Sequence, residues 1–206
     1  MKKFLLIPLI FFFLMVKSYS DDIRNISVGE NINNIKERGY TGFKCYYNDE
    51  EIKSWYMYSN CPSDKNNYYL IKFEYDERFA LNENFEGTQI SGHPVIIYLS
   101  IDKNSIVQEI NAFSDPSAPF YFRKQAYLLW LRVYGRYGSD NWLCEEKPME
   151  KGHVKIGKKY INRTCNKIIN NKKYRLDTHF YFENNKQDKE NLVSKSFLQI
   201  KFQPNN

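Results

Sequence analysis

Four segments of the chain alternate apolar and polar side chains with a period of two, the pattern of a β-strand with one buried face. They are NYYLIKFEYDE (67–77), HPVIIYLSID (93–102), KKYRLDTHFYF (172–182) and SKSFLQIKF (194–202). In the first, Tyr69, Ile71 and Phe73 share one face, while Lys72 and Glu74 lie on the other. The sequence therefore predicts a half-buried β-strand in each of these four segments.

One segment has the spacing of a helix instead. FYFRKQAYLLWLRVYG, residues 120–135, repeats apolar residues at i, i+4, i+7, i+8 and i+11, and Gly135 is expected to end it. The apolar positions are Phe122, Ala126, Leu129, Trp130 and Val133. A shorter helix is expected around Ile32 and Ile35, ending at Gly39.

The four cysteines favour disulfide bonds, because the protein has the marks of an exported chain, as argued below. They are Cys45, Cys61, Cys144 and Cys165. Three pairings are open, and proximity in the sequence favours Cys45–Cys61 and Cys144–Cys165. A zinc site is the alternative, but the sequence has no C-x-x-C spacing. We expect no metal and no cofactor.

Two fragments, ERGYTGFKC and YGRYGSDNWLC, each place a cysteine six residues after a glycine that follows an expected helix. Each is followed by a second cysteine, an asparagine-rich turn, an aromatic strand, a loop and an apolar strand. This order predicts an α+β fold of two similar halves, each a helix packed on an antiparallel sheet with one disulfide. The halves would be residues 21–114 and 115–206, joined in one folded unit. Chance similarity in an aromatic-rich chain is the alternative.

A tandem helix-plus-sheet order with one disulfide per half resembles the secreted β-lactamase inhibitor proteins. The opening VGENINNIKERGY is similar to that of the small outer-membrane-assembly lipoproteins. The resemblance covers the order of elements along the chain after residue 20 and no specific motif. It implies a binding surface on a sheet face rather than an active site, and it identifies no functional residue.

The first 20 residues have the layout of a secretory signal peptide. Lys2 and Lys3 precede an apolar run of 13 residues, and small residues lead to an expected cleavage after Ser20. An uncleaved membrane anchor is the alternative, but a bilayer-spanning helix needs about 20 apolar residues. No later segment approaches that length. We expect an exported protein, periplasmic or secreted, with no membrane span in the mature chain.

The positive charge of the chain belongs partly to this leader. The formal net charge is +6, and it falls to about +3 when Lys2, Lys3 and Lys17 leave with residues 1–20. The electrostatic argument for nucleic-acid binding is correspondingly weak. We expect no nucleic-acid partner.

Three histidines, His93, His153 and His179, are the candidates for acid–base catalysis, and they define an alternative function as a small hydrolase or nuclease. His179 shares a predicted strand face with Arg175 and Asp177, so the three histidines are expected to be unrelated surface residues. No G-x-S-x-G, P-loop, G-x-G-x-x-G or H-E-x-x-H motif occurs. The sequence favours a protein that is not an enzyme.

The remaining candidate site is an aromatic cluster near the first two cysteines. It consists of Tyr46, Tyr47, Trp55, Tyr56 and Tyr58, which is more than two short strands can bury on one face. Exposed Tyr and Trp provide rigid contact area for macromolecules, although a second structural layer could instead cover them. The leading hypothesis is an exported, non-enzymatic cell-envelope or periplasmic protein that binds a protein or another envelope partner through an aromatic sheet face.

Overall fold

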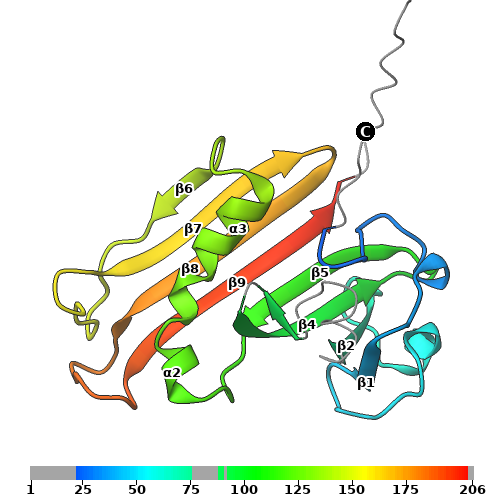
Figure 1. Cartoon of the computed structure of the whole chain (residues 1–206), viewed down its shortest axis with the longest axis horizontal. Helices are drawn as coiled ribbons and strands as arrows, with labels where there is room; N and C mark the ends of the chain where they lie inside the picture. Colours follow the sequence, from blue (N-terminus) through cyan, green and yellow to red (C-terminus); the bar gives the residue numbers. More distant parts are fainter. Residues whose placement is uncertain (1–21, 76–87, 91, 204–206) are drawn as a thin grey trace, which may run out of the picture.

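The alternating segments all form strands of one antiparallel sheet in the computed structural model, which describes residues 22–75, 88–90 and 92–203 (Figure 1). The strands are β1 (Tyr40–Cys45), β2 (Tyr69–Tyr75), β3 (Gln89–Ile90), β4 (His93–Ile101), β5 (Val107–Ser114), β6 (Leu143–Glu146), β7 (Ile161–Ile169), β8 (Lys172–Phe182) and β9 (Leu192–Phe202). Their order in the sheet is β1-β2-β4-β5-β9-β8-β7-β6, and β3 pairs with β4 beside that path. The expected signal peptide, residues 1–20, lies outside the described residues.

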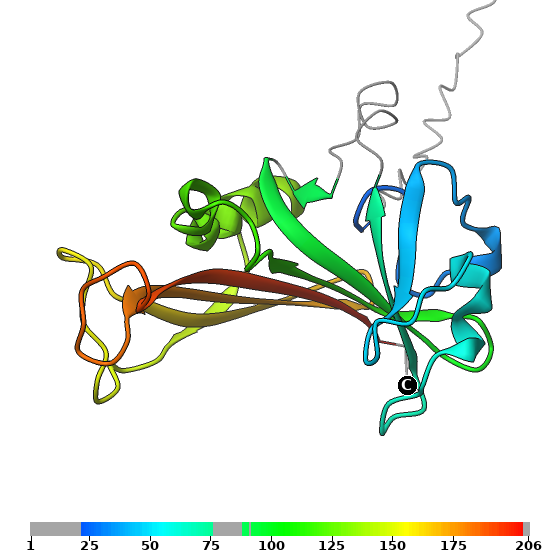
Figure 2. The same cartoon turned by 90° about the horizontal axis from the view of Figure 1, so that it is seen from below.

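The helical elements are short and lie on one side of β7, β8 and β9 or beside β2 (Figure 2). They are the 3₁₀ turns η1 (Ile32–Asn34), η2 (Trp55–Asn60) and η3 (Ala126–Leu128), and the helices α2 (Phe120–Arg123) and α3 (Leu129–Tyr137). We call the sheet face that they cover the inner face, and the opposite one the outer face.

The hydrophobic core lies between the inner face and this helical layer. Its sheet residues alternate along each strand, as the period of two requires. They include Ile71, Phe73, Val95, Ile97, Leu99, Ile110, Ala112, Leu176, Leu198 and Ile200, each 3% exposed or less. The residues that pack on them from outside the sheet include Ile23, Ile26, Ile32, Ile35, Trp55, Leu129 and Val133.

The prediction of two similar halves, each a helix on its own antiparallel sheet, is wrong. The fold is mainly β, and residues from both predicted halves contribute to a single nine-stranded sheet. The two parts meet where Glu109–Phe113 of β5 pairs with Phe197–Lys201 of β9. Strand alternation shows which side chains are buried, but it does not show which strand lies next to which. That is why the sequence order suggested two separate sheets.

Three local predictions of secondary structure differ from what the structure shows. The expected first helix is only the three-residue turn η1, capped by the Asn31 side chain, which accepts from the Asn33 N–H. The expected second helix is divided into α2, η3 and α3, so that Phe122 is 37% exposed. The segment from Ile52 to Cys61, expected as a strand of a hairpin, instead contains η2, whose N-terminal cap is Ser54.

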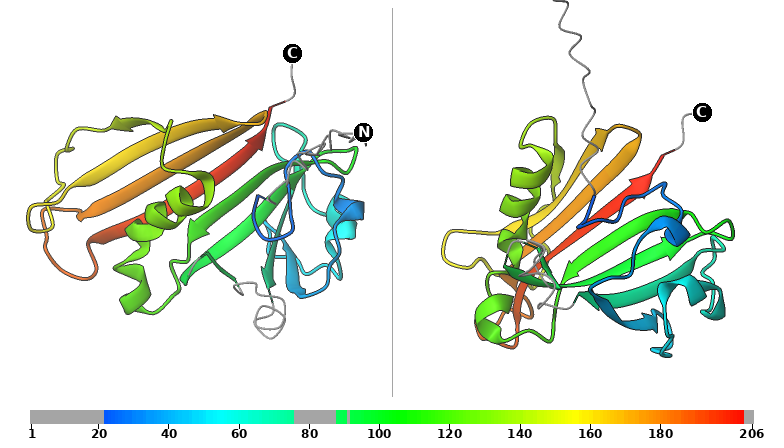
Figure 3. Two further views of the ribbon diagram at one scale, coloured as in Figure 1. Left: turned by 45° about the horizontal axis from the view of Figure 1, so that its top comes forward. Right: turned by 45° about the vertical axis from the view of Figure 1, so that its right-hand side comes forward.

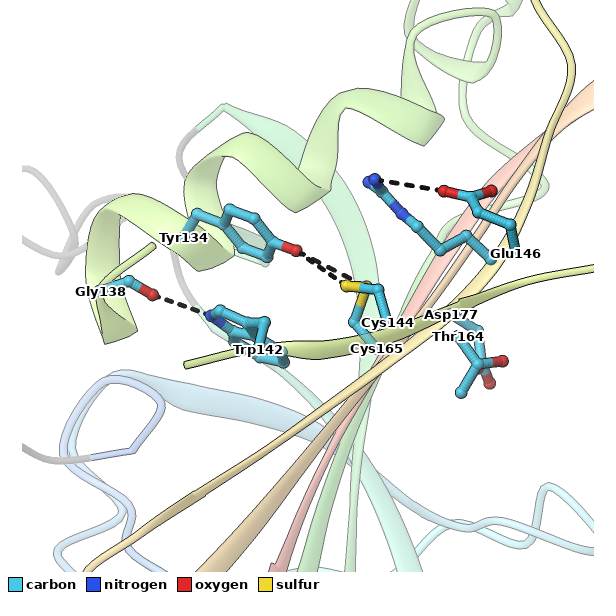
Figure 4. The surroundings of a disulfide bond; sticks show 9 residues. Tyr134, Gly138, Trp142, Cys144, Glu146, Thr164, Cys165 and Asp177 are labelled. Atoms are coloured by element: carbon cyan, nitrogen blue, oxygen red, sulfur yellow. Dashed lines mark hydrogen bonds and ion pairs between the residues drawn. A yellow bond between two sulfur atoms is a disulfide. The ribbon is translucent and has the colours of Figure 1, made fainter. Parts of the chain in front are cut away.

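Two disulfides are present, and they are the pairs that proximity favours. Cys45–Cys61 joins the end of β1 to the residue after η2, and Cys144–Cys165 joins directly opposed residues of β6 and β7. The Tyr134 hydroxyl of α3 lies 3.4 Å from the Cys144 sulfur and 3.5 Å from that of Cys165. Figure 4 shows this tyrosine directed at the disulfide. The second disulfide therefore lies under α3, on the inner face of a sheet edge.

The helix α3 continues through Gly135 and ends at Gly138, which has a φ of 80°. Positive φ is the conformation that glycine adopts without strain at a helix end. The Lys167 ammonium donates to the carbonyls of Tyr137 at 2.6 Å and of Gly138 at 3.2 Å. The Trp142 indole also donates to the Gly138 carbonyl, at 2.8 Å (Figure 4). A buried lysine of β7 thus stops the helix three residues beyond the predicted glycine.

Asp22 connects the N-terminal segment to the sheet and to α3. Its buried carboxylate accepts from the Val28 N–H at 2.8 Å, the Lys172 ammonium at 2.8 Å and the Tyr174 hydroxyl at 2.9 Å. Its carbonyl accepts from the Arg136 Nε at 3.1 Å and from the Tyr137 hydroxyl. One residue thereby joins β8, α3 and the segment that leads to η1.

We predict that Asp22→Ala lowers the free energy of unfolding by about 3–5 kcal/mol, because it leaves the Lys172 ammonium buried without its counter-ion. Chemical denaturation monitored by fluorescence gives the value. Asp140→Ala is the control, because the Asp140 side chain is 74% exposed and the Lys167 ammonium that it faces keeps its bonds to the Tyr137 and Gly138 carbonyls; its effect should stay within about 0.5 kcal/mol. Adding Lys172→Met to Asp22→Ala should recover part of the loss. Equal effects of Asp22→Ala and Asp140→Ala would contradict this role for Asp22.

Candidate functional site

The outer face of the central strands carries an uninterrupted run of aromatic side chains. Its members on the strands alternate with core residues, so they point away from the helical layer, and the two that follow β1 join them through ring contacts. They are Tyr46 and Tyr47, which follow β1, Tyr98 of β4, Phe113 of β5 and Phe197 of β9. We call these five residues the aromatic stripe. No helix of the described residues lies over β4, β5 or β9 on this side (Figure 2).

Four members of the stripe contact one another in succession across the sheet, and the fifth is in register with the fourth. The ring centroids are 5.5 Å apart for Tyr47 and Tyr46, 4.4 Å for Tyr46 and Tyr98, and 6.1 Å for Tyr98 and Phe113. Phe113 is the Cα partner of Phe197. Tyr47 is 54% exposed and the other four are half-buried. Burial raises the pKa of Tyr98 to about 12, so its hydroxyl stays protonated and neutral at physiological pH.

Polar residues hold the outer face beside the stripe in a fixed arrangement. The Lys201 ammonium contacts Glu109 at 2.8 Å, and the Gln199 amide donates to Glu109 and to Asn111, at 3.1 Å in each case. At the other end, Lys72 forms an ion pair with Asp49. Charges of both signs, paired with one another, therefore border the stripe.

The structure separates the five aromatic residues that the sequence grouped. Tyr46 and Tyr47 belong to the stripe. Trp55 is 0% exposed and packs on Tyr40 at 4.7 Å between ring centroids. Tyr58 is buried, and its hydroxyl bonds to the Ser105 hydroxyl at 2.9 Å. Trp55 and Tyr58 are thus buried because η2, to which they belong, itself packs on the sheet.

Tyr56 is the remaining member of the predicted cluster. It is 42% exposed, and its hydroxyl donates to the Ile35 carbonyl at 2.7 Å. This contact holds it against the segment that follows η1, apart from the stripe. It is available at the surface but does not extend the outer-face aromatic surface.

Sequence reasoning missed Tyr98, Phe113 and Phe197, although the signal for them was present. Tyr98 lies between Ile97 and Leu99, which point inward, so the same alternation that predicted the core places Tyr98 on the other face. Phe197 stands in the same relation to Leu198. What the sequence could not show is that β5 and β9 are neighbours, which brings the three rings together.

Two of the three histidines lie together, contrary to the expectation that they are unrelated. The His153 ring stacks on Tyr181 at 4.0 Å between centroids, and the His179 ring lies 6.4 Å from the same tyrosine. His153 Nδ1 is 3.1 Å from the Tyr160 hydroxyl. Burial, followed by the nearby Lys195 ammonium, lowers the pKa of His179 and favours its neutral form.

His93 is elsewhere, at the start of β4. Burial, followed by the charge of Arg132 from α3, lowers its pKa as well. The histidines therefore form one pair and one separate residue.

Two features are absent from the described residues, 22–75, 88–90 and 92–203. No helix within them is long and apolar enough to cross a membrane. They also contain no group of three or more His, Cys, Asp or Glu side chains arranged to hold a metal ion.

Comparison of the chain with protein-family models, curated proteins and solved structures finds no match in any of the three. The function is therefore argued from the site alone.

The different positions of Trp55 and Tyr47 make a test of this description. Trp55→Ala should lower the free energy of unfolding by about 3–5 kcal/mol, because it empties a large volume in the core. Tyr47→Ala should change it by no more than about 0.5 kcal/mol, as expected for a surface substitution. Chemical denaturation of both variants measures the difference. A small effect of Trp55→Ala would place that residue at the surface, against the structure.

Proposed function

We propose that this chain is an exported, non-enzymatic protein of the cell envelope or periplasm that binds a protein partner through the outer face of its sheet. The observation that carries the proposal is the aromatic stripe, in which four rings contact one another in succession and a fifth, Phe197, pairs across the sheet with the fourth, on a face without a helical cover. Tyrosine and other aromatic residues are enriched at the centres of protein interfaces. The two disulfides are consistent with an oxidising compartment.

The dimensions of the stripe favour a macromolecule. From β1 to β9 it crosses five neighbouring strand positions, which at about 4.8 Å per strand is roughly 19 Å. A standard protein interface covers about 800 Å² on each partner, and a patch of this width would be its centre. Charged pairs at both ends, Lys72 with Asp49 and Lys201 with Glu109, would form the polar rim.

A protein also fits the charges better than a nucleic acid does. The charges beside the stripe are paired within the molecule, whereas a phosphate backbone needs unpaired Lys and Arg side chains along its path. A partner with a mixed surface, apolar at its centre and charged of both signs around it, matches this face.

The test uses the double variant Tyr47→Ala/Tyr98→Ala. Proteins of an envelope extract that bind the immobilised parent are identified by mass spectrometry, and the purified partner is then titrated by calorimetry. If each of the two aromatic side chains contributes more than about 1 kcal/mol to the binding free energy, the double variant should bind the partner at least about 10-fold more weakly.

Tyr121→Ala/Leu131→Ala is the matched control, since both residues are exposed but belong to α2 and α3. It should bind as the parent does. The proposal fails if the two double variants bind equally, provided that their unfolding curves match that of the parent.

A second candidate function, a small hydrolase or nuclease, is favoured by the contact of His153 and His179 with Tyr181. A neutral His179 beside the Lys195 ammonium could accept a proton near an anionic group. His153→Ala/His179→Ala should then abolish an activity that His93→Ala preserves, measured on a panel of ester, phosphodiester and glycoside substrates. Equal activity in all three proteins, or none in the parent, would remove this candidate.

A further inference from the structure

The strand β9 extends beyond its neighbour β5. It pairs with β8 along its whole length, Leu192 to Phe202, but its pairing with β5 ends at Phe197. Figure 3 shows β9 continuing past the end of β5. Over Leu192–Lys195, no strand of the described residues lies on the β5 side, since Ser196 still lies opposite Ser114, the last residue of β5. This open edge is four residues long, or roughly 13 Å at about 3.3 Å per residue.

The direction of the main-chain groups along this edge follows from one hydrogen bond. The Ser196 N–H donates to the Ser114 hydroxyl of β5 at 3.2 Å, so the main chain of residue 196 faces the β5 side. Main-chain groups along a strand face alternate sides with a period of two. Ser194 and Leu192 therefore turn their N–H and C=O groups toward the same side, where no strand receives them.

The side chains of the same residues are held by the helical layer. The Ser194 hydroxyl donates to the Lys124 carbonyl at 3.1 Å and accepts from the Tyr127 N–H at 3.3 Å. The Ser196 hydroxyl donates to the Ala126 carbonyl at 3.0 Å. These contacts fix the edge in an extended conformation from the inner side, so that it is prepared for pairing without first being ordered.

A cleft of about 620 Å³ lies along this edge. It is bounded by the end of β5, the residues that lead to α2, and β8 and β9, and ligand sites commonly have volumes of about 300–1,000 Å³. Its aromatic residues are Phe113, Phe120 and Phe197. Phe113 and Phe197 also end the aromatic stripe, so the cleft and the stripe are continuous.

The charges that line the cleft balance one another. Three are positive (Arg123, Lys189, Lys195) and three are negative (Asp115, Asp177, Glu183), while burial favours neutral His179. A polyanion would meet as many repelling as attracting groups. A polypeptide main chain, neutral and rich in donors and acceptors, matches both the charge balance and the unpaired groups of Leu192 and Ser194.

We infer that this cleft binds an extended polypeptide segment, which adds a strand to the open edge of β9. The inference rests on the proposed function and specifies how the partner is held: a segment of about four residues pairs with Leu192–Lys195, and its side chains contact Phe113, Phe197 and Phe120 in alternation. Addition of a strand to an exposed sheet edge gains affinity from main-chain hydrogen bonds and specificity from alternate side chains.

The variant Ser194→Pro tests the main-chain contact, with Ser194→Ala as its control. Proline removes the N–H that faces the cleft but none of the bonds to β8, and strand edges tolerate it. Both substitutions remove the Ser194 hydroxyl. A displayed library of random 12-residue peptides is selected on the full chain, and the enriched peptides are titrated. We expect Ser194→Pro to weaken their binding at least 10-fold relative to Ser194→Ala.

A scan of the enriched peptide covers the case in which Ser194→Pro fails to fold. N-methylation of successive peptide residues, titrated against the unaltered protein, should weaken binding at every second position, since only alternate N–H groups face β9. The inference is overturned if no peptide is enriched, if Ser194→Pro and Ser194→Ala bind equally, or if the scan shows no alternation. It is also overturned if the parent dimerises and Ser194→Pro is monomeric, because a second copy would then occupy the edge.

Failure of this inference can be distinguished from failure of the proposed function. If Tyr47→Ala/Tyr98→Ala weakens the captured partner and Ser194→Pro does not, the partner binds on the aromatic stripe without adding a strand. If neither change weakens it, the outer face is not the binding surface.

Discussion

The buried carboxylate of Asp22 is the contact on which the arrangement of the other elements depends. Its ligands come from β8, from the loop before η1 and, through its carbonyl, from α3. From this point the chain runs along the edge of β5, where the Gly29 N–H donates to the Val107 carbonyl at 2.8 Å. The N-terminal segment thus contacts both parts of the sheet. The carboxylate holds the residue against β8, and its carbonyl, which accepts from Arg136 and Tyr137, holds α3 over the inner face.

The two faces of the sheet differ as a result. All helical elements of the described residues, the N-terminal segment and both disulfides lie on the inner face. The outer face of β4, β5 and β9 therefore carries only the side chains of the sheet itself. Its polar residues bond to one another, and its aromatic rings contact one another. On the inner side, the hydroxyls of Ser194 and Ser196 anchor α2 and η3 and leave the main chain of β9 free at its edge. The proposed binding surface is therefore the sheet face that the helical layer does not cover.

The alternating segments of the sequence predicted β2, β4, β8 and β9 and their buried faces, because alternation depends only on local geometry. Ile97 and Leu99 are buried as expected. The sequence did not predict the single sheet, since the pairing of β5 with β9 joins residues about 90 apart. For the candidate site, the sequence grouped Tyr46 with Tyr47, which lie together, but it placed Trp55 on a strand. Trp55 instead lies in η2, a 3₁₀ turn that begins after the Ser54 cap, so its side chain does not follow the period of two of a strand. The role of Ser194 depends on tertiary contacts with residues 124–127 and has no local signal.

Hydroxyl-radical footprinting of the protein with and without its captured partner tests the central claim, that the partner lies on the outer face. Oxidation of individual side chains would be read by mass spectrometry. The account predicts that the partner protects Tyr47, Tyr98, Phe113 and Phe197, while Tyr121 on α2 reacts equally in both samples. Trp55, intrinsically more reactive but buried, should stay unoxidised throughout. Protection confined to Tyr121 and the exposed residues of α3, with the aromatic stripe unchanged, would contradict the account.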